Sequence, residues 1–206
     1  QYFAKKFFSP IIVSPYLERD DEIKLFIVND FLAPVEDAVL DVTLYSALSF
    51  APLWSFQLQP KVPAAVSVDL GSHLVSDQVQ RHGCSRFLLC FFWFALRDRT
   101  TRKLLAPETY LLPRDFKETR LHASTIKVTS VMGPTVDAAH TRFRTFNITL
   151  HADSIALFVW LTAHHRSGRF SDNGFLLKNP TINVQFHTRE KLTAEALEKA
   201  LMIETL

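Results

Sequence analysis

Cysteine, glycine and long apolar runs are all scarce in this chain. Its 206 residues include two Cys and five Gly. Two cysteines cannot supply the disulfide framework of a small secreted domain. The longest uncharged apolar stretch covers residues 87–96, well short of the roughly 20 residues that cross a bilayer as a helix. The sequence therefore predicts a chain that folds around its own apolar core, with no membrane partner.

Strongly charged segments are also missing. The chain has 23 basic and 21 acidic residues, a formal net charge of +2, and no block of five like charges. Nucleic-acid binding needs a basic stripe, so nucleic acid is not an expected partner. The sequence also lacks a Gly-rich phosphate loop and the GxSxG and HExxH motifs, and so predicts no cofactor.

The two cysteines, Cys84 and Cys90, are predicted to be packed core thiols. On a single strand they would lie roughly 20 Å apart. That distance excludes a bond between them unless Cys84 lies in a turn that folds back. His82 adds a third possible metal ligand, but a fourth ligand and a CxxC spacing are missing, so no metal site is predicted.

What the sequence does contain is apolar–polar alternation with a period of two, which predicts strands with one face on a core. Five segments show it, at 53–59, 66–70, 125–129, 145–151 and 181–187. Two runs that are apolar on both faces, 87–96 and 155–161, predict central strands or strands covered by a neighbouring domain. Further strands are predicted at 23–28, 39–45 and 103–112. Ten strands separated by turn residues indicate an all-β fold of sandwiches rather than βαβ units.

Helical signals are confined to the two ends of the chain. Aromatic residues at positions 2, 3, 7 and 8, before Pro10, predict a short N-terminal helix. Thr193 is a predicted N-cap for a helix through Leu201, followed by a last strand at 203–206. A charged stretch at 113–121 predicts a boundary between two domains. Because the chain opens with Gln, we expect a fragment or a processed product.

Acidic side chains are the main candidates for chemistry. Sugar hydrolases of the retaining type use two carboxylates about 5–5.5 Å apart. The candidates here are Glu18, Asp20, Asp21, Glu36, Glu108, Asp153 and Asp172. Nearly all lie in turn contexts and are predicted to be solvated, so no catalytic residue is predicted. Asp172 lies within GRFSDNGF (168–175), whose composition favours a tight turn; a calcium or sugar contact is the alternative.

Two adjacent histidines, three tryptophans and one sequon are further candidates for a function. His164 and His165 are adjacent and would face opposite sides of a strand, so they cannot chelate one metal. The tryptophans Trp54, Trp93 and Trp160 are predicted to pack in cores; carbohydrate binding requires one of them to be exposed in a groove. Asn147 begins the one N-glycosylation sequon, Asn-Ile-Thr, on the polar side of a predicted strand, where the acceptor can be reached.

Several segments together resemble one known family. They are YFAKKFFSPIIVSPYLE at 2–18, Val28-Asn29-Asp30, PETYLL at 107–112, ALFVWL at 156–161 and GRFSDNGFLL at 168–177. In order and content they are similar to the C-terminal region of animal lysosomal β-mannosidases, in glycoside hydrolase family 2, over essentially the whole chain. The sequence departs from the family at Thr109, where the family usually has Asn, and in a polar insert at 164–167.

The resemblance implies three regions: 1–12 as the end of a helix after a missing (β/α)8 barrel, 13–118 as an immunoglobulin-like or carbohydrate-module-like sandwich, and 119–206 as a C-terminal immunoglobulin-like sandwich. It implies a lysosomal, retaining exo-glycosidase as the parent, which removes terminal β-mannose with two glutamates in the barrel. The barrel is then the expected partner, with an oligosaccharide as a second. No position here matches the catalytic motifs, so none is carried over.

Three hypotheses follow. The chain is the accessory part of a β-mannosidase, or a stand-alone carbohydrate-binding sandwich, or a structural interaction module.

Overall fold

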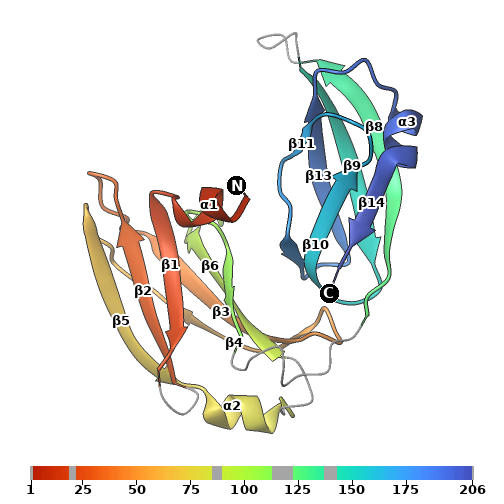
Figure 1. Cartoon of the computed structure of the whole chain (residues 1–206). Coiled ribbons are helices and arrows are strands. Elements are labelled where there is room, and N and C mark those ends of the chain that lie inside the picture. The colour runs from red at the N-terminus through yellow and green to blue at the C-terminus, as the bar shows by residue number, and fades with distance from the viewer. Residues whose placement is uncertain (1, 19–21, 85–89, 113–122, 137–142, 206) are drawn as a thin grey trace. The chain divides into compact units, whose positions relative to one another are not determined.

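The computed structural model describes residues 2–18, 22–84, 90–112, 123–136 and 143–205. These residues form two compact units, one before and one after the segment 113–122 (Figure 1). The predicted domain boundary falls in that segment, outside the described residues, and stays a prediction. Both units are built mainly of antiparallel strands, so the predicted all-β fold class is confirmed.

Two facing sheets make the first unit. One has the strand order β1-β2-β5 and the other β4-β3-β6-β7. The strands are β1 Ile11–Leu17, β2 Glu22–Asn29, β3 Ala38–Ser46, β4 Pro52–Leu58, β5 Val66–Leu74, β6 Cys90–Asp98 and β7 Thr109–Leu111. Because β6 has a neighbour on each side, the interpretation of the apolar run as a central strand is confirmed for residues 90–96. Residues 87–89 of that run lie outside the described residues.

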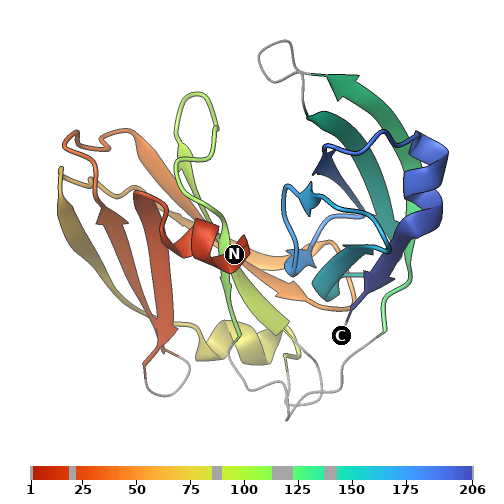
Figure 2. The same cartoon turned by 45° about the horizontal axis from the view of Figure 1, so that its top comes forward.

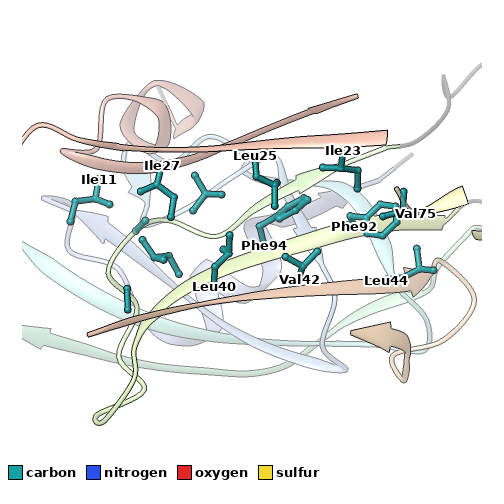
Figure 3. Close-up of a cluster of buried hydrophobic side chains, with 14 of the residues drawn as sticks. Ile11, Ile23, Leu25, Ile27, Leu40, Val42, Leu44, Val75, Phe92 and Phe94 are labelled. Carbon is teal, nitrogen blue, oxygen red and sulfur yellow. The ribbon is translucent and has the colours of Figure 1, made fainter. Parts of the chain in front are cut away.

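Alternation along β2 builds the core of this unit. Ile23, Leu25 and Ile27 are at most 1% exposed and point toward the other sheet, where Phe92 and Phe94 of β6 meet them (Figure 3). Burying a side chain of this size stabilises a fold by about 1.5–3 kcal/mol. Lys24 and Phe26, which lie between them, face away from the core, as a two-residue period requires.

Two short helices accompany this unit. Helix α1, Tyr2–Phe7, lies where the aromatic spacing predicted one and has no buried residue. Helix α2, Ser76–Arg81, was not predicted; its residue Val79 and the preceding Val75 enter the core. Asp77 lies in the first turn of α2, where a negative charge favours a helix.

The second unit also has two sheets, with the orders β11-β13-β9-β8 and β12-β10-β14. The strands are β8 Ile126–Val136, β9 Arg144–Ala152, β10 Ala156–Ala163, β11 Arg169–Phe170, β12 Phe175–Leu177, β13 Thr181–Thr188 and β14 Leu201–Glu204. Phe146, Ile148 and Leu150 of β9 are fully buried, and Val159 of β10 and Phe186 of β13 are at most 1% exposed. The sandwich core lies between these two layers.

Helix α3, Ala194–Ala200, lies against β8 at the side of this sandwich (Figure 2). The Thr193 hydroxyl accepts a hydrogen bond from the Ala196 N–H at 3.2 Å. The predicted N-cap is therefore confirmed, and Leu197 on the inner face of α3 is fully buried. Strand β14 begins two residues before the predicted last strand.

Candidate functional surfaces

The GRFSDNGF segment is organised by the buried side chain of Asn173, which is 3% exposed. Its Oδ1 accepts a hydrogen bond from the Leu161 N–H at 2.6 Å, and its Nδ2 donates to the Leu161 carbonyl at 2.8 Å. One side-chain amide thus satisfies both backbone groups of a residue in β10. Asn173 acts as an extra rung of the β12-β10-β14 sheet.

The two glycines of this segment meet separate steric requirements. Gly174 has a φ of +66°, which favours glycine, and its N–H donates to the Val159 carbonyl at 2.8 Å. At Gly168 a Cβ would overlap the ring of Phe186 and lie 2.8 Å from the His187 carbonyl oxygen. Asp172 accepts a bond from the Asn173 N–H at 2.9 Å. The chain bends at residues 171 and 174, between β11 and β12. The residue that the prediction missed is Asn173, signalled only by its position before a glycine.

The other acidic candidates do not gather in one place. Glu108 is paired with Arg97 at 3.1 Å, and Glu18 accepts a hydrogen bond from Ser72 at 2.9 Å. Glu36 is exposed, while the candidates at 20 and 21 lie outside the described residues. These carboxylates are held by neighbouring side chains or solvated, and none is shown opposite a second acid in a pocket.

Asp153 shows the electrostatics of such a turn acid. Its carboxylate accepts hydrogen bonds from the Thr125 N–H at 2.9 Å and the Ser124 hydroxyl at 3.2 Å. The Thr125 N–H is the main cause that lowers the pKa of Asp153 below its ordinary value. A glycosidase general acid needs a raised pKa, so this environment favours the wrong protonation state for that role.

Aromatic rings cover the side of β6 that faces away from the core. Trp93 stacks on Tyr110 of β7 with centroids 6.2 Å apart, and Tyr45 of β3 stacks on Phe91 at 5.6 Å. Phe91 is fully buried. Burial raises the pKa of both tyrosines, with the charge of Glu108 adding to the effect at Tyr45. Trp93 therefore packs against Tyr110 on this outer face and not in the core, where it was predicted.

The other two tryptophans have different surroundings. Trp54 packs on the first core, as predicted. Trp160 is 43% exposed, so the prediction that it is buried was wrong. Val159 and Leu161 on either side of it point inward, and the alternation of β10 therefore turns the indole to the outer face of its sheet. There its cross-strand partner is Glu204 of β14.

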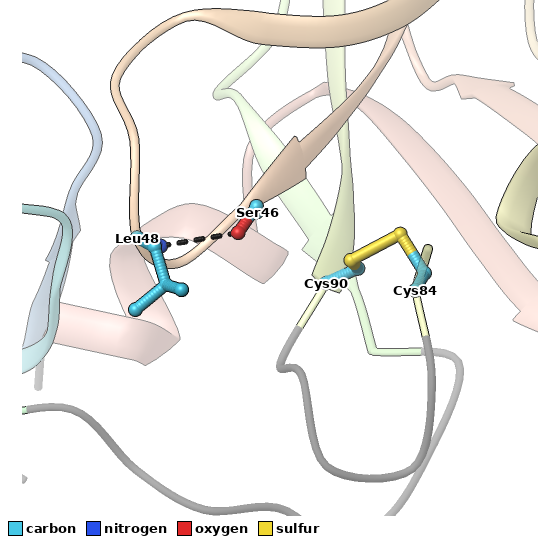
Figure 4. The surroundings of a disulfide bond; sticks show 4 residues. All are labelled: Ser46, Leu48, Cys84 and Cys90. Atoms are coloured by element: carbon cyan, nitrogen blue, oxygen red, sulfur yellow. Dashed lines mark hydrogen bonds between the residues drawn. A yellow bond between two sulfur atoms is a disulfide. The ribbon is translucent and has the colours of Figure 1, made fainter. Parts of the chain in front are cut away.

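The structure corrects the prediction of two separate thiols. Cys84 and Cys90 form a disulfide, with their Cα atoms 5.7 Å apart (Figure 4). The distance argument assumed that the two residues share a strand, and they do not. Gly83, with a φ of +69°, turns the chain back after α2, and the Cys84 N–H donates to the Val79 carbonyl. Within the described residues, β6 begins at Cys90.

The disulfide also removes the zinc alternative, since both sulfur atoms that would ligate a metal are bonded to each other. Within the part of the chain that the structure describes, His, Cys, Asp and Glu side chains form no group of three that could hold an ion. His164 and His165 are exposed in the turn after β10.

Asn147 lies on the outer face of the β11-β13-β9-β8 sheet, with its side chain half-exposed. Its Oδ1 accepts a hydrogen bond from Gln185 Nε2 at 3.1 Å. The sequon is thus on the polar side of its strand, where it was predicted.

Phenylalanines of the N-terminal segment form an apolar surface, which we call the α1 aromatic surface: Phe3, Phe7 and Phe8. Their exposed fractions are 47%, 57% and 79%. Phe7 and Phe8 contact each other, with ring centroids 4.6 Å apart. Large aromatic side chains grouped at a surface are typical of an interaction site.

Comparison with known proteins assigns the fold of the second unit. The family model for the Ig-fold domain of mannosidases matches residues 123–206. Two solved enzymes share the fold of the whole chain. A β-D-mannosidase from Dictyoglomus thermophilum has a TM-score of 0.70 at 20% identity, over 99% of this chain and 22% of its own. An exo-chitosanase from Amycolatopsis orientalis has a TM-score of 0.65 at 14% identity, over 99% of this chain and 26% of its own.

Curated relatives match the full chain in sequence. The β-mannosidase of Capra hircus is 31% identical over 209 residues and that of Bos taurus 30% over 210, each across 100% of this chain. In both cases the aligned part is 22% of the relative. The chain thus spans about a fifth of the length of the relatives that it matches.

Proposed function

Because the chain resembles the β-sandwich region of glycoside hydrolase family 2 β-mannosidases over its whole length, we propose that it is the accessory, non-catalytic C-terminal part of such an enzyme. The parent would hydrolyse terminal, non-reducing β-D-mannose residues of oligosaccharides and glycoproteins. The single observation that carries this proposal is that a complete match to this chain uses only 22% of each relative. The other four-fifths leave room for a (β/α)8 catalytic barrel.

The local chemistry of the described residues supports a non-catalytic role. Glu108 forms an ion pair with Arg97, and the carboxylate of Asp153 is stabilised in its ionised form by turn hydrogen bonds. The lowered pKa of Asp153 disfavours the protonated carboxylic acid that the first step of glycoside hydrolysis needs. In this proposal the two catalytic glutamates belong to the barrel.

The α1 aromatic surface is the proposed contact with that barrel. Burying phenylalanine side chains stabilises an interface, at about 25 cal/mol for each Å² of apolar area removed from water. Helix α1 buries none of its residues within the structure. The relatives' additional length supplies the occupant, which is the rest of the parent chain.

The disulfide and the sequon support a location reached by the secretory route, and the family resemblance makes that location the lysosome. Protein disulfides form and persist in oxidising compartments. No helix in the described ranges is long and apolar enough to cross a membrane.

The mass of the native protein, with an activity measurement, tests the proposal. An antibody raised against this chain should recognise a native polypeptide several times heavier than 23.6 kDa. That polypeptide should hydrolyse a chromogenic β-mannoside, and the purified 206-residue chain should not. Turnover by the isolated chain, or a native protein of the chain's own mass, would overturn the proposal.

A stand-alone carbohydrate-binding module is the second candidate, and the exposed indole of Trp160 favours it. Sugar rings stack on exposed aromatic faces, and Glu204 lies across from Trp160 on the next strand. This alternative predicts that calorimetry detects mannobiose binding and that Trp160→Ala abolishes it. Met202→Ala, at another exposed residue of β14, is the matched control. A flat titration of the unmodified chain would eliminate the alternative.

A further inference from the structure

The outer face of the β8-β9-β13 part of the second unit is polar and almost uncharged. Strands β9 and β13 pair in register over eight residues, and their outward side chains stand opposite each other. These pairs are Thr145–His187, Asn147–Gln185, Thr149–Asn183 and His151–Thr181. They contain no acidic residue, no Lys or Arg, and no Phe, Tyr or Trp. A face of hydroxyl and amide groups lacks the aromatic and arginine anchors that dominate protein interfaces.

Asn147 lies in the middle of this face. On one side Gln185 is its register partner, and on the other side its partner is Met132 of β8. Met132 is 59% exposed, the one large apolar side chain in this row. Thr149, the third residue of the sequon, points to the same face and donates a hydrogen bond to Asn183 Oδ1 at 2.8 Å.

We propose that Asn147 carries an N-linked glycan whose first sugar covers Met132 on this face. In the transfer, Nδ2 of Asn147 attacks the anomeric carbon of a lipid-pyrophosphate-linked oligosaccharide. The C–N bond forms, the bond from that carbon to the pyrophosphate oxygen breaks, the lipid pyrophosphate leaves, and Nδ2 loses one proton. The donor and its transferase belong to the secretory compartment.

The folded geometry tolerates the modification. Gln185 donates to Oδ1 of Asn147, and Oδ1 is the atom that glycosylation leaves as an acceptor. Nδ2 keeps one hydrogen after the transfer, so the amide stays planar and the hydrogen bond from Gln185 is preserved. Met132 is the cross-strand partner of Asn147 on β8 and is 59% exposed, so a sugar attached to Nδ2 has this apolar side chain beside it to cover.

An independent observation points to the same compartment. The Cys84–Cys90 disulfide requires an oxidising environment, which is also where oligosaccharide transfer to Asn takes place. The disulfide belongs to the first unit and the sequon to the second, so neither observation depends on the other.

Peptide mapping of the native protein tests the modification at its site. The tryptic peptide 145–166 contains Asn147 and no other sequon. Deglycosylation by a peptide amidase in ¹⁸O water should convert Asn147 to Asp carrying the heavy oxygen. In the full-length protein secreted from animal cells, Asn147→Gln and Thr149→Ala should abolish the label, while Thr149→Ser should keep it. An unmodified Asn147 in protein whose Cys84–Cys90 disulfide has formed would overturn the proposal.

Methionine oxidation tests the position of the first sugar. The chain has two methionines, Met132 and Met202, and both are exposed, at 59% and 44%. With peroxide, Met132 should oxidise several-fold more slowly relative to Met202 in glycosylated protein than in the Asn147→Gln variant. An endoglycosidase that leaves only the first sugar should preserve this protection, and complete removal should abolish it. Equal ratios in all four samples would refute the covering of Met132.

Discussion

At the scale of single residues, Asn173 is the member of the GRFSDNGF segment that connects it to β10. Asp172 attracts attention in the sequence because it carries charge. In the fold the neutral neighbour makes the buried contacts, because an amide can donate and accept at once while a carboxylate can only accept. The two backbone groups of Leu161 need one acceptor and one donor, and Asn173 supplies both.

Asn173→Ala should therefore destabilise the second unit by about 2–3 kcal/mol, since it leaves buried backbone groups without partners. Urea unfolding followed by circular dichroism measures this as a lower transition midpoint. Asn179→Ala is the matched control, because Asn179 is an exposed residue just after β12. Its effect should stay within about 0.5 kcal/mol. Equal effects of the two changes would contradict the structural role given to Asn173.

At the scale of elements, strands with strict alternation were predictable. The patterns of β9 and β13 indicated both the location and the buried face of each strand. Successive side chains of a strand point to opposite faces, so the apolar residues share the buried face and the polar residues share the face in water. Strand β1 was missed because Pro15 interrupts its pattern and proline is expected only at edges. Strand β1 is in fact the edge of its sheet. Helix α2 is too short for a helical period to show.

The surfaces were less predictable than the strands. The apolar run around Trp160 predicted burial on both sides, yet only the inward side of β10 is covered at that position. Whether an outer face is covered depends on neighbours that local pattern does not encode. The Cys84–Cys90 disulfide was missed for a similar reason, since the argument against it did not anticipate the left-handed conformation of Gly83 just before Cys84.

The disulfide links the end of α2 to the start of β6, and it closes a short loop with a sequence separation of six. Loop-closure entropy for a ring of this size gives a stabilisation of about 2 kcal/mol. Reduction, or the Cys84→Ala/Cys90→Ala double variant, should lower the unfolding midpoint of the first unit.

The second unit provides the control for that change, because it contains no cysteine. Its unfolding, followed by the fluorescence of Trp160, should not respond to reduction. Alkylation without reductant should label neither cysteine. Labelling of both in the folded, unreduced protein would show that the bond does not form.

At the scale of the whole molecule, the two proposed surfaces have opposite chemistry. The face around Asn147 is hydroxyl- and amide-rich, and an attached glycan would exclude a protein partner from it. In the α1 aromatic surface, Phe7 and Phe8 are more than half exposed. Contact between these apolar rings and water is unfavourable, so burial against a partner would stabilise them. The accessory role therefore predicts docking through α1 and solvent at Asn147.

Phe7→Ser/Phe8→Ser provides the test of that docking. In the native-length protein the double variant should destabilise the catalytic part by roughly 2–4 kcal/mol, because two rings leave an apolar interface. This appears as faster thermal loss of β-mannosidase activity. In the isolated chain the same change should leave the unfolding midpoint nearly unaltered, since both rings already face water there. Leu32→Ser, at a side chain that is 91% exposed, should have little effect in either protein. A loss of stability in the isolated chain equal to that in the native-length protein would mean that the rings stabilise the sandwich itself, and the docking role would be wrong.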